Sequence, residues 1–127
     1  MAKPAHTSYS EDPKIDALVD ETIARVADKW TLLLIEALEV AGPKRFSVLG
    51  REVQGISQKM LTQTLRQMER EGLVARTVFP EVPPRVEYEL TGLGHELAEA
   101  FCGVWTWAEK NIGRIEAARA AYDDRNS

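Results

Sequence analysis

The chain has 127 residues, of which 44% are hydrophobic and 28% charged, so it is long enough for one soluble domain with its own core. The only dense apolar run covers residues 32–35, far short of the roughly 20 that a membrane helix needs, and residues 1–11 lack the apolar stretch of a signal peptide, so we expect a cytoplasmic protein without a membrane partner. One cysteine and two histidines are too few for a zinc site or an internal disulfide, so we expect no metal and no other cofactor, and the net charge of −4 by itself argues against nucleic acid.

The N-terminal part predicts a polar tail and two helices. Residues 1–12 are polar, and we expect them to be disordered. Apolar residues then recur at helical spacing over residues 15–26, which predicts an amphipathic helix. Asp28 is a good N-cap for a second helix over residues 29–40. Because that helix is apolar on nearly all sides, it should be the central helix of the core.

A short third helix and a tight turn come next. Residues 47–53 carry one apolar stripe, and Gly55 stands where a helix end favours a left-handed residue. Ser57 can then cap a fourth helix over residues 58–71. Two short helices joined by a three-residue turn with a glycine are typical of a helix-turn-helix.

The next segment predicts a β-hairpin. Residues 73–79 are typical of a strand, and residues 85–90 alternate between polar and apolar side chains. The connecting residues 80–84 are too rich in proline to pair within a sheet. Two strands with such a connection, directly after a helix-turn-helix, predict a wing. The fold class is therefore mainly α with a small β-hairpin, a winged helix-turn-helix.

Thr91 can cap a last, long helix whose apolar residues lie on one face up to Ile115. This apolar surface is broader than one hairpin could cover, so we expect the N- and C-terminal helices to form a homodimer. Trp105, Trp107 and Phe101 could instead line a ligand pocket, although large aromatic areas are commoner in cores and interfaces. Cys102 is interpreted as a packing residue. The candidate interface residues are Ile15, Leu18, Val19, Phe101, Trp105 and Ile112.

The fourth helix carries the candidate chemistry. At about 100° per residue, its long polar side chains occupy an arc without a carboxylate, opposite Leu61, Leu65 and Met68. Amide, hydroxyl and cationic groups read base edges, and the free N–H groups at a helix start can bind a phosphate. The alternative is an ordinary solvated helix face. The arc comprises Lys59, Thr62, Gln63, Arg66 and Arg70, and Gln58 precedes it.

The distribution of charge supports DNA more than its total does. Residues 43–90 hold eight Lys or Arg and six Asp or Glu, a net of +2, which leaves −6 for the rest of the chain. Lys44 and Arg45 could hold a phosphate, or simply belong to a solvated loop. Arg85 and Arg76 could extend from the wing to DNA, or pair with Glu87 or Glu81 across strands. The candidate DNA contacts are Lys44, Arg45, Ser57, Gln58, Lys59, Thr62, Gln63, Arg66 and Arg85.

Two segments of the chain resemble the HxlR-type regulators, winged-helix transcription factors related in shape to the MarR group. They read DKWTLLLIEAL (28–38) and KRFSVLGREVQGISQKMLTQTLRQMEREGLVARTVFPEVPPRVEYELTGLG (44–94). The resemblance implies a bacterial dimer that binds a two-fold operator. It also implies that residues 57–66 form the first part of the recognition helix and that Arg85 is the wing arginine. Several family members that sense oxidants, quinones or aldehydes carry a cysteine in or just before the first helix, and residues 11–27 contain none.

We therefore expect a sequence-specific regulator of transcription, a repressor by the commoner mode of such families, that binds double-stranded DNA as a homodimer. The expected division is a tail over residues 1–12, the winged domain with its dimerisation helices over 13–122, and a tail over 123–127. A small-molecule effector remains open, its identity not given by the sequence. The rival is a winged helix that only contacts other proteins, which an acidic recognition face would have favoured. No catalytic pair, phosphate loop or metal cluster predicts an enzyme.

Overall fold

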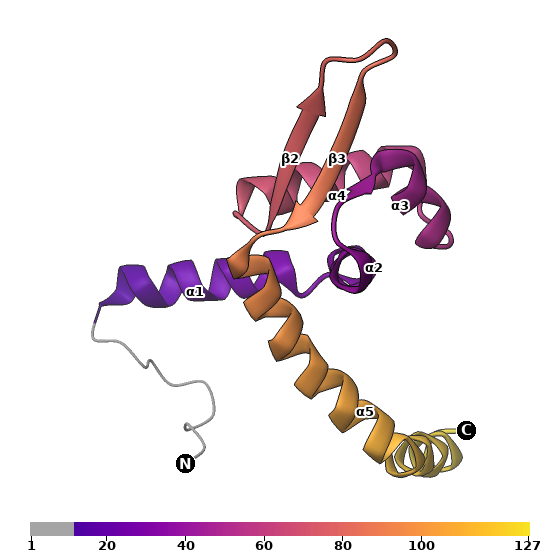
Figure 1. Ribbon diagram of the computed structural model, residues 1–127. Coiled ribbons are helices and arrows are strands. Elements are labelled where there is room, and N and C mark those ends of the chain that lie inside the picture. Colours follow the sequence, from indigo (N-terminus) through magenta and orange to yellow (C-terminus); the bar gives the residue numbers. More distant parts are fainter. Residues whose placement is uncertain (1–11) are drawn as a thin grey trace.

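The computed structural model describes residues 12–127 and confirms a mainly helical winged helix-turn-helix with one small antiparallel sheet (Figure 1). Helix α1 and the long helix α5 project from the body that the other elements form. In chain order the elements are α1 (Pro13–Val26), α2 (Lys29–Ala41), β1 (Lys44–Arg45), α3 (Phe46–Glu52), α4 (Gln58–Arg70), β2 (Val74–Phe79), β3 (Arg85–Leu90) and α5 (Gly92–Arg125).

Helix α2 is the central element of the core, as its all-round apolar sequence predicts. The Asp28 carboxylate caps it by accepting hydrogen bonds from the backbone N–H groups of Trp30 and Thr31. Leu34, Ile35 and Leu38 are almost completely buried, and α2 packs against α3, α4, α5 and β3. The body around α2 therefore has a hydrophobic core of its own, and α3, α4 and the sheet pack on this core.

The helix-turn-helix consists of α3, the turn at residues 53–57 and α4. Gly55 has φ +85° in this turn, a left-handed conformation that a side chain would strain. The Ser57 hydroxyl accepts a hydrogen bond from the Met60 backbone N–H at 3.0 Å, which confirms the predicted cap of α4. Leu61, Leu65 and Met68 are buried against the core, so the opposite face of α4 is turned to solvent.

The sheet has three strands in the order β1-β3-β2, one more than the hairpin that the sequence predicts. Lys44 pairs with Tyr88 and Arg45 with Glu87, so these two cations lie in a strand where a solvated loop was an alternative. Helix α3 accordingly begins at Phe46, one residue before the predicted start. A strand of two residues has no alternation to reveal it, and only its pairing with β3 makes it one.

The start of α5 is attached closely to the end of α4. The Thr91 hydroxyl donates to the Gly72 carbonyl at 2.6 Å and accepts from the Gly94 N–H at 3.1 Å, which caps the helix. A Cβ at Gly94 would lie 2.2 Å from the carbonyl oxygen of Leu73. Only a glycine permits this approach, so the direction in which α5 leaves the body is set here.

The two ends of the described chain differ from the predicted tails. Helix α5 continues to Arg125, so most of the predicted tail over 123–127 is helical. Asp12, the last residue of the other predicted tail, caps α1 by accepting from the Lys14 N–H at 2.9 Å; residues 1–11 lie outside the described part. No residue of α1 is buried.

Candidate nucleic-acid interface

The outer face of α4 carries a group of exposed, unpaired polar side chains. Lys59, Gln63 and Arg66 are exposed, and within residues 12–127 neither cation takes part in an ion pair. The Thr62 hydroxyl donates to the Gln58 carbonyl at 3.0 Å, which holds this side chain close to the helix. We call Lys59, Thr62, Gln63 and Arg66 the reading face. Its donors and acceptors suit base edges and phosphates.

The C-terminal end of α4 is different, because its cation has an acidic partner, which it shares with Arg25 of α1. Arg70, which the sequence places in the same arc, donates to the Glu71 carboxylate at 3.3 Å. Glu69 lies beside it and pairs with Arg76 of β2 at 3.4 Å. The unpaired positive charge on the outer face of α4 is therefore that of Lys59 and Arg66, ahead of the last turn.

The beginning of α4 adds backbone donors to this face. The first four N–H groups of a helix have no partner within it. The side chain of Ser57 satisfies the N–H of Met60, and the hydrogen bonds of the helix itself begin at Leu61, whose N–H donates to the Ser57 carbonyl at 2.9 Å. The N–H groups of Gln58 and Lys59 stay available to a phosphate, at the positive end of the helix dipole. Ser57 thus shapes the site as the cap of α4, and its O–H remains a donor.

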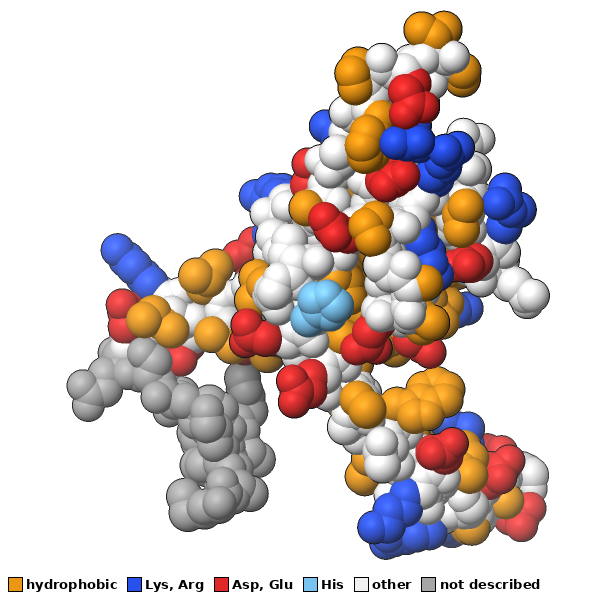
Figure 2. All heavy atoms as spheres, in the orientation of Figure 1, with side chains coloured by type: hydrophobic (Ala, Val, Ile, Leu, Met, Phe, Trp, Pro, Cys, Tyr) orange, Lys and Arg blue, Asp and Glu red, His pale blue; other side chains and the backbone are white. Residues whose placement is uncertain are grey.

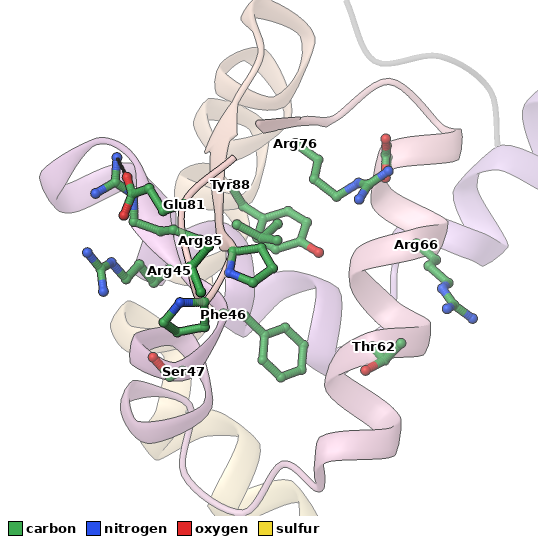
Figure 3. A pocket seen from close by; sticks show the side chains of 14 residues that line it. Arg45, Phe46, Ser47, Thr62, Arg66, Arg76, Glu81, Arg85 and Tyr88 are labelled. Carbon is green, nitrogen blue, oxygen red and sulfur yellow. Dashed lines mark ion pairs between the residues drawn. The ribbon is translucent and has the colours of Figure 1, made fainter. Parts of the chain in front are cut away.

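A cleft of about 730 Å³ separates α4 from the wing and from α3. In Figure 3 the rings of Phe46 and Tyr88 lie between the strands and α4, and Thr62 faces the cleft from the helix. Burial raises the pKa of the Tyr88 hydroxyl above its ordinary value of 10.0, so this group is neutral at physiological pH and offers both a donor and an acceptor. The cleft joins the reading face to the wing.

The wing arginine is held by the wing itself. Arg85 lies 3.1 Å from a Glu81 oxygen and 3.2 Å from a Glu87 oxygen, and its guanidinium stacks on the Phe79 ring with 4.0 Å to the centroid. The alternative pairing with Glu81 and Glu87 is therefore the one present, and Figure 3 shows the link to Glu81. An arginine whose charge is matched by two acids is a weaker attraction for phosphate than a free one.

The two cations of β1 have different environments. The Lys44 ammonium is paired with the Glu52 carboxylate, and only 12% of its side chain is exposed. Arg45 is exposed and has no ion pair within residues 12–127. Arg45 is therefore available to a ligand, whereas Lys44 is paired with Glu52, a residue of α3. Sequence reasoning missed Phe46 and Tyr88, which line the cleft, because a two-residue strand such as β1 leaves no pattern in the sequence.

The predicted dimer residues form exposed apolar surfaces on both projecting helices. Figure 2 shows hydrophobic side chains along α1 and along α5, away from the core. On α1, Leu18 is 61% exposed. On α5, Trp105 is 61% exposed and Phe101 is half-buried against the core. The other predicted interface residues, Ile15, Val19 and Ile112, are also exposed.

We also searched the described residues for a metal site and for a membrane-spanning helix. Over residues 12–127, no group of three His, Cys, Asp or Glu side chains is placed to hold a metal ion. Among the helices in the same range, none has the combination of length and hydropathy that a membrane crossing requires.

Known proteins share both the sequence and the fold. Residues 25–116 match the family described as HxlR-like helix-turn-helix. The uncharacterized HTH-type transcriptional regulator YtfH of Escherichia coli (strain K12) is 39% identical over 99 residues, 78% of each chain. The uncharacterized HTH-type transcriptional regulator YdeP of Bacillus subtilis (strain 168) is 38% identical over 118 residues, 91% of each chain. The solved structure of YtfH from Salmonella typhimurium, named a transcriptional regulator, has a TM-score of 0.70 at 38% identity and covers 80% of this chain and 89% of its own.

Proposed function

The chain belongs to the HxlR-like helix-turn-helix family of DNA-binding transcriptional regulators, and from this premise we propose that it acts as a homodimeric repressor on a pseudo-palindromic operator. Each protomer would place α4 in the major groove, with half-sites about 10 bp apart or a small multiple of it. Such a protein works where the chromosome is, in the cytoplasm. Residues 13–122 would act as one unit, with a binding role and no catalytic one.

The reading face is the observation that carries the proposal. Arg66 is free to bind a guanine, and Gln63 or Gln58 an adenine. Lys59, Arg45 and the N–H groups at the start of α4 would hold phosphates. Lys44 and Arg85 are the weakest of the nine candidates, because carboxylates already occupy them. Arg85 would reach DNA only by exchanging Glu81 or Glu87 for a phosphate.

The dimer follows from the apolar surfaces of α1 and α5. In a single protomer, about half or more of the surface of five apolar side chains is exposed to solvent: Ile15, Leu18, Val19, Trp105 and Ile112. Large contiguous apolar patches of this kind mark interaction sites. Phe101 would add the rim of the core to that contact. Two copies joined by these helices would carry their reading faces on the same side of the dimer, as a two-fold operator requires.

The proposal is tested by fluorescence anisotropy with the DNA upstream of the protein's own gene. We expect affinity in the nanomolar range that falls steeply with salt, since each phosphate contact adds about 0.9 to the slope of log K against log salt. Arg66→Ala should cost about 1–3 kcal/mol and relax the base preference at one position of each half-site. Arg114→Ala is the matched control, because Arg114 is an exposed arginine of α5 that donates to Asn111.

Two results would contradict the proposal. Nanomolar binding that Arg66→Ala leaves unchanged would show that α4 is not the recognition helix. Binding that is independent of both sequence and salt, together with specific capture of another protein by the same face, would favour a protein-docking winged helix.

A further inference from the structure

A second cleft, of about 600 Å³, lies between α2 and α5 and shares no lining residue with the cleft beside the reading face. Its floor includes Ile35 and Ala98, which are 1% and 4% exposed. Its walls are apolar side chains of both helices, with the aromatic rings of Phe101 and Trp105 on α5. The volume lies within the range of about 300–1,000 Å³ that is typical of small-molecule sites. We call it the α2–α5 groove.

The charges around the groove are mainly negative, three acids and one lysine. Glu36 and Glu39 line it from α2, and neither makes an ion pair within residues 12–127. Asp28 also lines it and serves as the cap of α2. The one cation of the lining, Lys29, stands over the ring of Trp30 at 4.8 Å to the centroid. A ligand would therefore meet an apolar, aromatic interior beneath two carboxylates.

We propose that the α2–α5 groove binds a lipophilic organic cation with an aromatic body of drug size. The apolar floor would not replace the hydration shell of an inorganic cation. The carboxylates would repel an organic anion, and they would attract a cation whose body fills the groove. The rings of Phe101 and Trp105 add cation–π attraction, about 0.5–2 kcal/mol for a cation within 6 Å of a ring.

The same charges argue against a helix of a second copy as the occupant. Helix α1 carries the acids Asp16, Asp20 and Glu21 and the cations Lys14 and Arg25, a net charge of −1 (2 − 3). It would therefore bring no net positive charge to Glu36 and Glu39, whereas an organic cation supplies the complementary charge. The groove is complete within one protomer, so Trp105 can edge a dimer contact while its ring still borders the groove. For the proposed regulator this would be an effector site.

The experiment is a titration without DNA, so its outcome is independent of the proposed function. Tetraphenylphosphonium is the probe and tetraphenylborate the control of the same shape and opposite charge. We expect saturable quenching of tryptophan fluorescence by the cation alone, with most of the signal lost in Trp105→Phe. The paired change Glu36→Gln with Glu39→Gln should weaken binding about tenfold, if each screened charge contributes about 0.7 kcal/mol.

Two further measurements make the assignment specific. The pair Glu109→Gln with Glu116→Gln changes the net charge equally on the part of α5 beyond the groove, and it should leave the affinity unchanged. Cys102 is the single cysteine of the chain and lines the groove, so the probe should slow its reaction with a thiol reagent. Equal binding of the borate would overturn the proposal. So would a Cys102 that reacts only after unfolding, because a second copy would then cover the groove.

Discussion

The winged body and the two projecting helices differ in how far their apolar sides are covered within one chain. In α4, Leu61, Leu65 and Met68 are buried, and the polar side of the helix faces solvent. In α1 no residue is buried, although its apolar residues recur at the same helical spacing. An amphipathic helix is stable in water only when its apolar side is covered. The body is therefore covered within one chain, whereas the proposed partner would cover the apolar sides of the projecting helices.

The comparison explains why the reading face can be polar. Because the hydrophobic core around α2 stabilises the body, α4 needs only its inner side for packing. Its outer side is free to carry Lys59, Gln63 and Arg66 without a loss of core area. One helix therefore serves two purposes: its buried side packs against the core, and its exposed side carries the polar side chains.

The largest expected effect separates the two regions directly. Leu34→Ala should lower the free energy of unfolding by about 2–5 kcal/mol at every protein concentration, because Leu34 is completely buried in the body. Leu18→Ala should instead weaken the dimer, because this side chain is 61% exposed in the protomer. Urea denaturation at several protein concentrations, with sedimentation, distinguishes them. A Leu18→Ala protein that remains dimeric but loses stability at all concentrations would place α1 in the core.

A smaller effect tests the junction between the two regions. Gly94→Ala should cost about 1–3 kcal/mol, because the new Cβ would lie 2.2 Å from the Leu73 carbonyl oxygen. Gly103→Ala in the same helix meets no atom within 4 Å, and it should stabilise the helix by up to about 1 kcal/mol. The urea midpoints of the two variants should move in opposite directions. If both rise, the α5 start is not held as closely as the structure has it.

The smallest effect tests the difference between free and paired cations within the body. Lys59→Ala should reduce the salt slope of DNA binding by about 1, the loss of one phosphate contact. Lys44→Ala should leave the slope unchanged, because the Lys44 ammonium is paired with Glu52. Anisotropy titrations at four salt concentrations measure both slopes. An equal loss in the two variants would mean that Glu52 releases Lys44 to DNA.

Much of the body could be predicted from short-range signals. Ser57 before an apolar-periodic segment predicts the start of α4, and Gly55 predicts the turn that φ +85° confirms. The side of α4 that faces solvent follows from its spacing of Leu61, Leu65 and Met68. These features depend on neighbours within one turn of helix or one tight turn, where periodicity and capping determine the conformation.

The sequence by itself determined the helices, the turn, the hairpin and the side of α4 that is polar, because each depends on residues a few positions apart. Only the tertiary structure decided the partners of the charged residues. Strand β1 exists through its pairing with β3, Lys44 is bound to Glu52, and Arg85 lies between Glu81 and Glu87. The α2–α5 groove likewise joins helices far apart in sequence. An ion pair or a cleft requires two side chains to meet in space, and a one-dimensional pattern does not state which ones meet.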